Sequence, residues 1–228
     1  MSRKILSSVL LFLAVPAGLI WCMAGDMEQT ALLSTLVVAS GVFAVFLQFE
    51  HTKPRPRDLM PTVVLTALCV TGRMLFAALP NFKPVSAIVI MAGLCFGRHS
   101  GFLTGALSAL ISNLFFGQGA WTPWQMYAWG LMGYGAGMLS QTRLFKNNIA
   151  VLLYGAIASF GYGFILNSWY LFSFLQPVSW PVAVAAYGAG FVFDISHAVS
   201  TVVFLSLALW PWRKELGRIR QKYGLMEL

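Results

Sequence analysis

Charged residues are scarce in this sequence. Asp, Glu, Lys and Arg make up 10% of its 228 residues, whereas apolar residues make up 58%. The mean hydropathy is +0.75, and a soluble domain carries far more charge on its surface. The composition therefore predicts an integral membrane protein. A membrane β-barrel is excluded, because the apolar and polar residues do not alternate as they do in barrel strands.

Cysteines and catalytic signatures are also few. The three cysteines, Cys22, Cys69 and Cys95, lie at unrelated positions inside apolar stretches, and no CxxC pair occurs. This pattern is typical of small buried residues and argues against a disulfide framework, a metal site or a nucleophile. GxxxxGK[ST], HExxH and GxSxG are absent as well. We therefore expect no cofactor, no metal ion and no ATP hydrolysis by this chain.

What the sequence does contain is eight apolar runs. A helix needs about 20 residues to cross ~30 Å of hydrocarbon with its backbone hydrogen-bonded internally. The predicted spans are residues 5–24, 30–49, 61–79, 85–97, 101–116, 124–141, 149–172 and 182–210. The sequence thus predicts an all-α integral membrane protein, in which the fourth and fifth spans are the shortest.

Positive charge favours one side of this span map. Of the 15 Lys and Arg residues, 13 lie before the first span, after the eighth, or in the connections that follow the second, fourth and sixth. The positive-inside rule places this side, with both termini, in the cytoplasm of a multi-pass protein of the cell membrane. Topology signals and the anionic lipid bilayer account for the net charge of +8, so no nucleic-acid partner is expected.

One connection on the opposite side is rich in aromatic and amide side chains. Residues 117–126 read GQGAWTPWQM and carry no charge. Tryptophans at this depth are typical of the interfacial aromatic belt, but a stacking surface beside amide donors also suits an uncharged, polar ligand. The candidate ligand-binding residues here are Asn113, Gln118, Trp121, Trp124 and Gln125.

A second outer connection, residues 80–84, reads PNFKP. Its two prolines fix the backbone, so that Asn81 and Lys83 are presented in a defined direction. The segment is either part of a ligand site or a plain turn with a lysine at the lipid headgroups, and both interpretations stay open.

Two charges lie deep inside predicted spans. An unpaired charge at such depth costs at least ~2.5 to 3.5 kcal/mol, so we expect Arg73 and Asp194 to form an ion pair across the bundle. Asp194 also shares a helix face with His197, three residues later. That spacing would suit a proton relay or two metal ligands, but without a third ligand a structural hydrogen bond is favoured.

Residues 81–88, NFKPVSAI, and the stretch 117–126 that follows Asn113 resemble the S component, the substrate-binding membrane subunit, of energy-coupling factor (ECF) vitamin transporters. The resemblance covers residues 58–212, whose six spans match the six-helix S-component bundle. Residues 1–57 add two N-terminal spans with a basic loop, and residues 213–228 form a basic cytoplasmic tail.

The family implies a mechanism. An S component of a bacterial cell membrane captures a vitamin at the outer face and topples while docked on a transmembrane coupling subunit, and two ATPase subunits supply the energy. In this family an Ala-xxx-Ala pattern on the first core helix contacts the coupling subunit. The matching positions here are Ala67 and Thr71.

Within the family, the sequence is most similar to cobalamin-specific S components. A corrinoid is large, amide-fringed and close to neutral, which suits an outer face of Trp, Asn and Gln. A vitamin with a carboxylate or phosphate would require cationic partners, and only Lys83 and Arg73 could serve. The alternatives are another substrate (pantothenate, a queuosine precursor or dimethylbenzimidazole), an intramembrane enzyme that uses Asp194 and His197, and a structural protein without a ligand.

Overall fold

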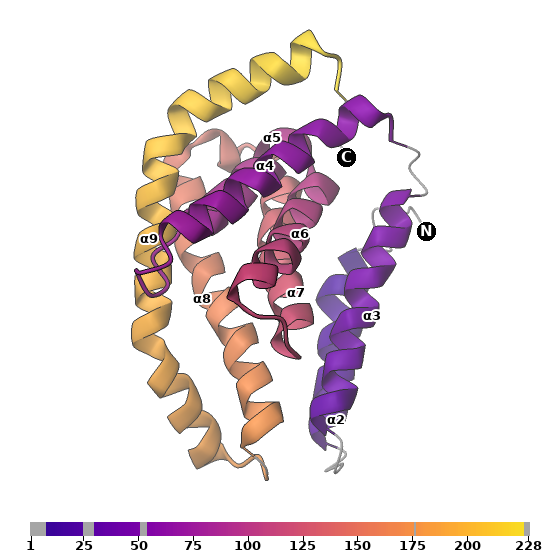
Figure 1. Ribbon diagram of the computed structural model, residues 1–228, viewed down its shortest axis with the longest axis vertical. Coiled ribbons are helices and arrows are strands. Elements are labelled where there is room, and N and C mark those ends of the chain that lie inside the picture. The colour runs from indigo at the N-terminus through magenta and orange to yellow at the C-terminus, as the bar shows by residue number, and fades with distance from the viewer. Residues whose placement is uncertain (1–7, 25–29, 51–53, 176, 226–228) are drawn as a thin grey trace.

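The computed structural model describes residues 8–24, 30–50, 54–175 and 177–225, which form a bundle of helices (Figure 1). In chain order these are η1 (Leu10–Ala14, a π-helix), α2 (Val15–Ala24), α3 (Thr30–Glu50), α4 (Pro56–Leu75), α5 (Val85–Phe96), α6 (Arg98–Phe116), α7 (Trp121–Leu139), the 3-10 helix η2 (Leu144–Lys146), α8 (Asn148–Phe174) and α9 (Trp180–Lys222). Each predicted span overlaps one of these helical stretches, and the all-α class is confirmed.

The helices differ in whether they can cross a membrane alone. α3, α4, α8 and α9 are long and apolar enough to do so. α5 has 12 residues and rises only about 18 Å, which is too short for a ~30 Å hydrocarbon layer. Almost all of its side chains are buried, so the fourth predicted span is a half-length helix enclosed by the others.

Direct backbone contact holds α5, α6 and α7 together. A Cβ atom at Gly133 of α7 would lie 2.2 Å from the carbonyl oxygen of Gly101 in α6, and one at Gly93 of α5 would lie 2.1 Å from that of Gly133. Only glycine fits at such distances. In lipid, where no hydrophobic effect drives helices together, this close packing is a main source of association.

The two N-terminal helical segments form a hairpin on one side of the bundle (Figure 1). Their apolar residues, among them Val15 and Val38, share a core with the fully buried Trp124 of α7. Two polar contacts add to it: the Tyr127 hydroxyl donates to the Leu11 carbonyl at 2.5 Å, and Trp124 Nε1 donates to Thr35 Oγ1 at 3.3 Å. The hairpin is thus bound to the face of α7 that carries these residues.

α9 is longer than its predicted span. It has 43 residues, about 65 Å of helix, and it continues through Pro211 instead of ending at residue 210. Its last part bends and crosses the upper end of the bundle (Figure 1), where Arg213 donates to the Phe145 carbonyl at 2.8 Å and Arg220 to that of Cys95 at 3.3 Å. The stretch predicted as a tail is therefore helical as far as Lys222.

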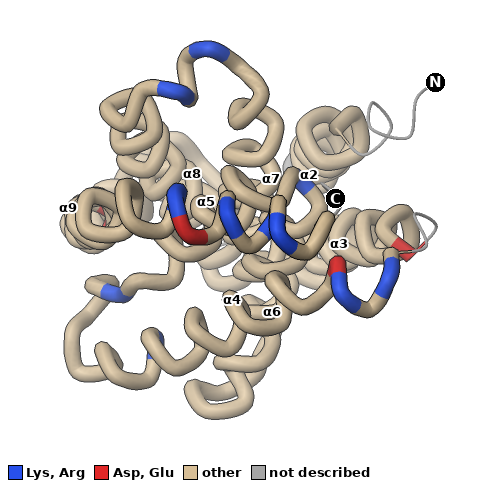
Figure 2. Tube along the Cα trace, turned by 90° about the horizontal axis from the view of Figure 1, so that it is seen from above, with Lys and Arg blue, Asp and Glu red and all other residues tan. Residues whose placement is uncertain are grey.

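Lys and Arg residues gather at this upper end. Seen from above, they lie on the last turns of α9, on the connection before α8 and at the start of α4 (Figure 2). There Arg55 and Asp58 form a capping box at the start of α4, and the hydrogen bond that the Arg55 guanidinium donates to the Asp58 carboxylate raises the pKa of Arg55. The cytoplasmic orientation of this end stays a prediction from the positive-inside rule.

The glycine contacts generate a stability prediction. We expect Gly133→Ala to lower the free energy of unfolding by about 1 to 3 kcal/mol, because the added methyl group overpacks the α6–α7 interface. The matched control is Gly161→Ala in α8, where a Cβ atom meets nothing within 4 Å. Thermal unfolding of the detergent-solubilised variants checks this, and equal melting temperatures for the two variants would contradict it.

Candidate functional site

A small polar cavity lies within the part of the bundle formed by α4 to α9. Its volume is about 60 Å³. The side chains that line it come from α4, α5, α7, α8, α9 and the connection between α4 and α5; they are Arg73, Asn81, Lys83, Val85, Ser86, Gln125, Trp129, Tyr162 and His197. Polar donors from five helices therefore converge on one small space.

The connection between α4 and α5 is fastened to the middle of α9. Ser196 and Ser200 donate to the carbonyls of Pro80 and Lys83 at 3.2 and 3.0 Å, and Asn81, with a φ of 53°, donates to the Phe193 carbonyl at 3.4 Å. Phe193 lies 13 residues after the start of α9, or about 20 Å along it.

The connection is therefore recessed from the end of the bundle at which α9 begins, in agreement with the short α5 that follows it. Non-helical backbone at membrane depth persists only where protein or a polar cavity satisfies it. The serines of α9 and the cavity meet that requirement.

Arg73 does not form the predicted ion pair with Asp194. Its Nη1 donates to Ser112 and, at 2.7 Å, to Asn113 Oδ1, and its guanidinium lies 4.7 and 5.2 Å from the ring centroids of Phe116 and Trp129. The ion pairs within the described ranges are Arg55–Asp58 and Arg218–Glu215. Neutral acceptors and aromatic rings replace the expected carboxylate.

Asp194 is engaged elsewhere. Its carboxylate accepts a hydrogen bond from Asn167 at 3.4 Å and packs against Gly163 of α8, where an added Cβ atom would clash with it. His197, on the same helix, lies 2.6 Å from the Ser86 hydroxyl. The two residues therefore have separate hydrogen-bond partners. Asp194 bonds to Asn167 of α8, and His197 bonds to Ser86 of α5.

Ser86 connects two rings in the wall of the cavity. It accepts a hydrogen bond from Trp129 Nε1 at 3.1 Å, so its own proton is available to His197 Nε2. The imidazole also meets Tyr162 edge-on, with ring centroids 4.7 Å apart. One hydroxyl thus sets the positions of an indole and an imidazole.

Asn113 lies one step behind the cavity wall and is almost fully buried. Its amide nitrogen donates to Gln125 Oε1 at 2.9 Å and to Thr122 at 3.1 Å, while its oxygen accepts from Arg73. Gln125 in turn donates to the Tyr162 hydroxyl at 2.9 Å. This amide network fixes the side chains of Arg73, Gln125 and Tyr162 relative to one another.

The seven predicted ligand-binding residues do not form one group. Asn81, Lys83 and Gln125 line the cavity and Asn113 supports it. Gln118 is exposed and bonds to Leu110 of α6 and to Thr122 at the start of α7. Trp121 contacts Trp169 edge-on, and Trp124 is buried in the core shared with the N-terminal hairpin.

Sequence reasoning did not select Ser86, Trp129 or Tyr162. Ser86 lies inside the quoted NFKPVSAI segment, and Trp129 is one helical turn beyond Gln125, so both carried a detectable signal. Tyr162 lies in an apolar helix far along the chain and carried none.

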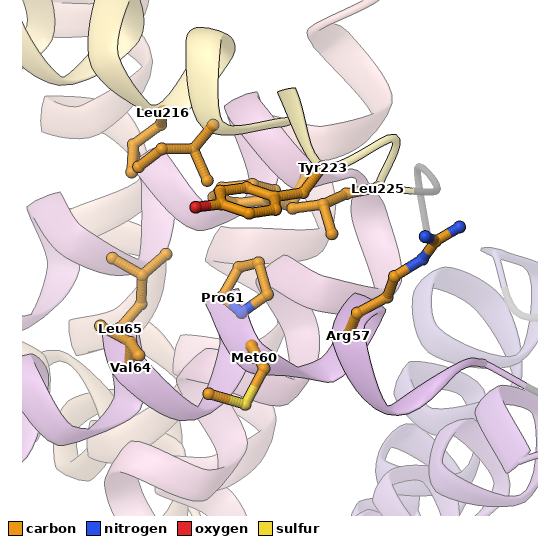
Figure 3. A pocket seen from close by; sticks show the side chains of 10 residues that line it. Arg57, Met60, Pro61, Val64, Leu65, Leu216, Tyr223 and Leu225 are labelled. Carbon is orange, nitrogen blue, oxygen red and sulfur yellow. The ribbon is translucent and has the colours of Figure 1, made fainter. Parts of the chain in front are cut away.

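A larger groove of about 320 Å³ lies elsewhere, between the first half of α4 and the end of α9 (Figure 3). Tyr223 and Leu225 form one wall and Met60, Pro61 and Val64 the other. Its lining is almost wholly apolar, which suits lipid or a protein surface better than a polar ligand. Size alone therefore does not identify the candidate site, and the convergence of polar groups favours the smaller cavity.

The part of the chain that the structure describes contains no group of three or more His, Cys, Asp or Glu side chains that could hold a metal ion.

Comparison with models of known protein families supplies a match that covers the site. The model of the family described as "ECF-type riboflavin transporter, S component" matches residues 55–212, which include every residue that lines the cavity. Neither the curated proteins nor the solved structures provide a match.

The Ser86 contacts generate a prediction. We expect Ser86→Ala to lower the free energy of unfolding by about 1 to 3 kcal/mol, because it leaves the buried Trp129 N–H without its acceptor and His197 Nε2 without its hydrogen-bond partner. Ser206→Ala is the matched control, since that exposed hydroxyl donates only within its own helix, to the Val203 carbonyl. Thermal unfolding measures both, and an unchanged Ser86→Ala protein would refute the assigned contacts.

Proposed function

The chain belongs to the family of ECF-type riboflavin transporter S components, and we propose that it captures an organic micronutrient of vitamin size in the polar cavity. S components are the substrate-binding membrane subunits of these transporters, so the chain is a transport subunit and not an enzyme. The family also implies association with a transmembrane coupling subunit and with ATPase subunits. In such a complex the ATPase subunits hydrolyse ATP, which fits a substrate-binding sequence that has no phosphate-binding loop of its own.

The observation that carries the proposal is the convergence of nine side chains from α4, α5, α7, α8, α9 and one connection on a single polar cavity. Buried polar groups in a membrane protein are unfavourable unless they are paired, and they are typical of substrate pathways. Every wall of the cavity lies within the segment that matches the family. The cavity therefore belongs to the transport core and not to the N-terminal hairpin.

Substrate entry requires the cavity to widen, because 60 Å³ is well below the ~300 to 1,000 Å³ of ordinary ligand pockets. We propose that the connection between α4 and α5 moves. Three hydrogen bonds to α9, from Ser196, Ser200 and Asn81, fasten it. The glycine-packed α5–α6–α7 contacts leave much less room for movement.

Two vitamins have specific support as the substrate. Cobalamin is favoured by the sequence resemblance and by the uncharged stretch 117–126, whereas riboflavin is named by the matching family model. Cobalamin is the larger, and its capture demands the wider opening. Pantothenate, a queuosine precursor and dimethylbenzimidazole are smaller alternatives.

An intramembrane enzyme based on Asp194 and His197 has less support. The two side chains bond to different helices, Asp194 to Asn167 and His197 to Ser86. A paired acid and base acting on one substrate would face a common space, yet of the two only His197 lines the cavity.

For the coupling subunit we propose a docking face on α4. Ala67 and Thr71 are exposed, and they lie on the same side of the helix as the exposed Met60 and Val64. Met60 and Val64 also line the apolar groove of Figure 3. Small residues flanked by apolar ones let another transmembrane helix approach closely, so this strip fits a helical membrane partner.

The site predicts a contrast between two glutamines. In isothermal titration calorimetry with cobalamin, riboflavin and pantothenate, we expect one-to-one binding of one of these vitamins. Gln125→Met should weaken it at least about tenfold, or ~1.4 kcal/mol, because Gln125 lines the cavity. The matched change Gln118→Met, outside the cavity, should leave the affinity within about twofold.

The reverse ranking would move the binding site to the stretch 117–121 and contradict the proposal. Circular dichroism of each variant before titration ensures that a loss of affinity is not a loss of folding.

The docking face predicts a separation of functions. We expect Ala67→Trp and Thr71→Trp to abolish co-purification with the coupling and ATPase subunits, because the added ring prevents close helix contact. Vitamin binding to the isolated subunit should be unchanged. Ile157→Trp, at an exposed position of α8, is the matched control, and an intact complex with all three variants would place the interface elsewhere.

A further inference from the structure

We propose that the substrate presents an anionic group, a carboxylate or a phosphate, to Arg73 and Lys83 together. This inference rests on the proposed function, since it takes the polar cavity to be the substrate site. It goes further by assigning a chemical class to the substrate, and it differs from the neutral ligand that the outer tryptophans and amides suggest.

The wall of the cavity carries positive charge only. Its lining includes Arg73 and Lys83 but no aspartate or glutamate. The two cations line the same cavity of about 60 Å³, and like charges repel each other. Bringing like charges together in a poorly hydrated space is unfavourable, so an anion between them would relieve both the repulsion and the lack of a counter-ion.

No acidic residue in the described ranges pairs with Arg73. Asp58 and Glu215 belong to the ion pairs with Arg55 and Arg218 near the basic end of the bundle. Asp194 bonds to Asn167, and Glu50 ends α3 in the N-terminal hairpin. The half-buried guanidinium is thus solvated by neutral groups, which orient it without neutralising it.

The guanidinium of Arg73 is held through one of its nitrogens and against two aromatic rings. Ser112 and Asn113 both accept from Nη1, and the rings of Phe116 and Trp129 face the guanidinium. Five N–H donors form the planar fork of an arginine. With Nη1 anchored and the plane fixed against two rings, Nε and Nη2 are suited to a bidentate contact with a carboxylate or phosphate.

Lys83 is held in place by hydrogen bonds of its backbone and its side chain. Its backbone carbonyl accepts from Ser200 of α9, and its ammonium donates to the Leu79 carbonyl within its own connection at 3.2 Å. A lysine ammonium has three donors, so it can keep this bond while meeting an anion. An anion bound by both cations would bridge α4 and the connection between α4 and α5. Binding would therefore favour the state in which this connection covers the cavity.

The size of the cavity agrees with a head group and not with a whole vitamin. A volume of 60 Å³ admits a carboxylate or phosphate, whereas complete small-molecule ligands occupy several hundred Å³. The remainder of the substrate would lie beyond the connection, toward the end of the bundle at which α9 begins.

Matched pairs of ligands test the inference directly. The probes are pantothenate and its alcohol pantothenol, nicotinate and nicotinamide, and riboflavin 5′-phosphate and riboflavin, with cobalamin as a further ligand without net charge. Thermal stabilisation and calorimetry of the purified full-length protein are the readouts. We expect the anionic member of one pair to bind at least about tenfold more tightly than its neutral partner.

Two variants identify the residues responsible. Lys83→Met should reduce the anionic preference to within about threefold, and Arg73→Gln should do the same wherever the protein folds. Lys83 is the decisive position, because a change in the connection tests the idea even where Arg73→Gln does not fold. The charge-matched control is Lys214→Met, an exposed residue near the end of α9, which should leave the preference intact.

The outcomes separate this inference from the proposed function. A neutral ligand that binds as tightly as its anionic partner, with affinity lost in Gln125→Met, would overturn the anionic class and leave the cavity as the substrate site. An anionic preference that survives Lys83→Met would also overturn the assignment. Stabilisation by no member of any pair would count against both.

Discussion

The rest of this structure depends on backbone contact between α5, α6 and α7. Gly93, Gly101 and Gly133 bring the three backbones to distances that no side chain permits, and in lipid such van der Waals contact has to replace the hydrophobic effect. The tight packing lets the 12-residue α5 stay enclosed among longer helices. Because α5 is so short, the connection before it ends partway along α9, and the polar cavity forms in the recess beneath. A packing constraint at one end of the helices thus determines where polar groups can gather.

The charge of Arg73 is the second constraint, and it explains the polar residues around it. The guanidinium needs solvation at a depth where water is scarce. Ser112 and Asn113 supply acceptors, Phe116 and Trp129 supply ring faces, and Asn113 passes its hydrogen bonding on to Gln125. These partners are all neutral, so the network positions the charge and leaves it able to attract an anion. A carboxylate partner from the protein, as the sequence suggested, would have removed that capacity.

The sequence predicted the class of the protein well and the site only in part. Apolar runs of fixed length reveal helices in a membrane protein, because hydrocarbon leaves the backbone no alternative. The same reasoning could not show that α9 continues through Pro211, since a proline in the sequence usually indicates that a helix kinks or ends there. Asn81, Lys83 and Gln125, which line the candidate cavity, could be selected from the sequence because polar residues near a predicted boundary stand out. Trp121 and Trp124 stood out equally, and only the three-dimensional packing shows Trp124 in a core shared with the N-terminal hairpin.

Trp124 and Gln125 show how the added hairpin can serve a site that it does not touch. The two residues are consecutive in α7, so they point in different directions around the helix. Trp124 faces Thr35 and Phe172 in the core shared with the hairpin, while Gln125 faces the cavity and Tyr162. A helix that presents amides to a polar space has less apolar packing on that face, and the hairpin adds apolar packing on the face that carries Trp124. The tightly packed side of the cavity is then α7 with its glycine contacts and the hairpin, and the side that we propose to move is the connection that carries Lys83. A substrate bound between Arg73 and Lys83 would bridge the two sides, so that binding itself would hold the connection closed.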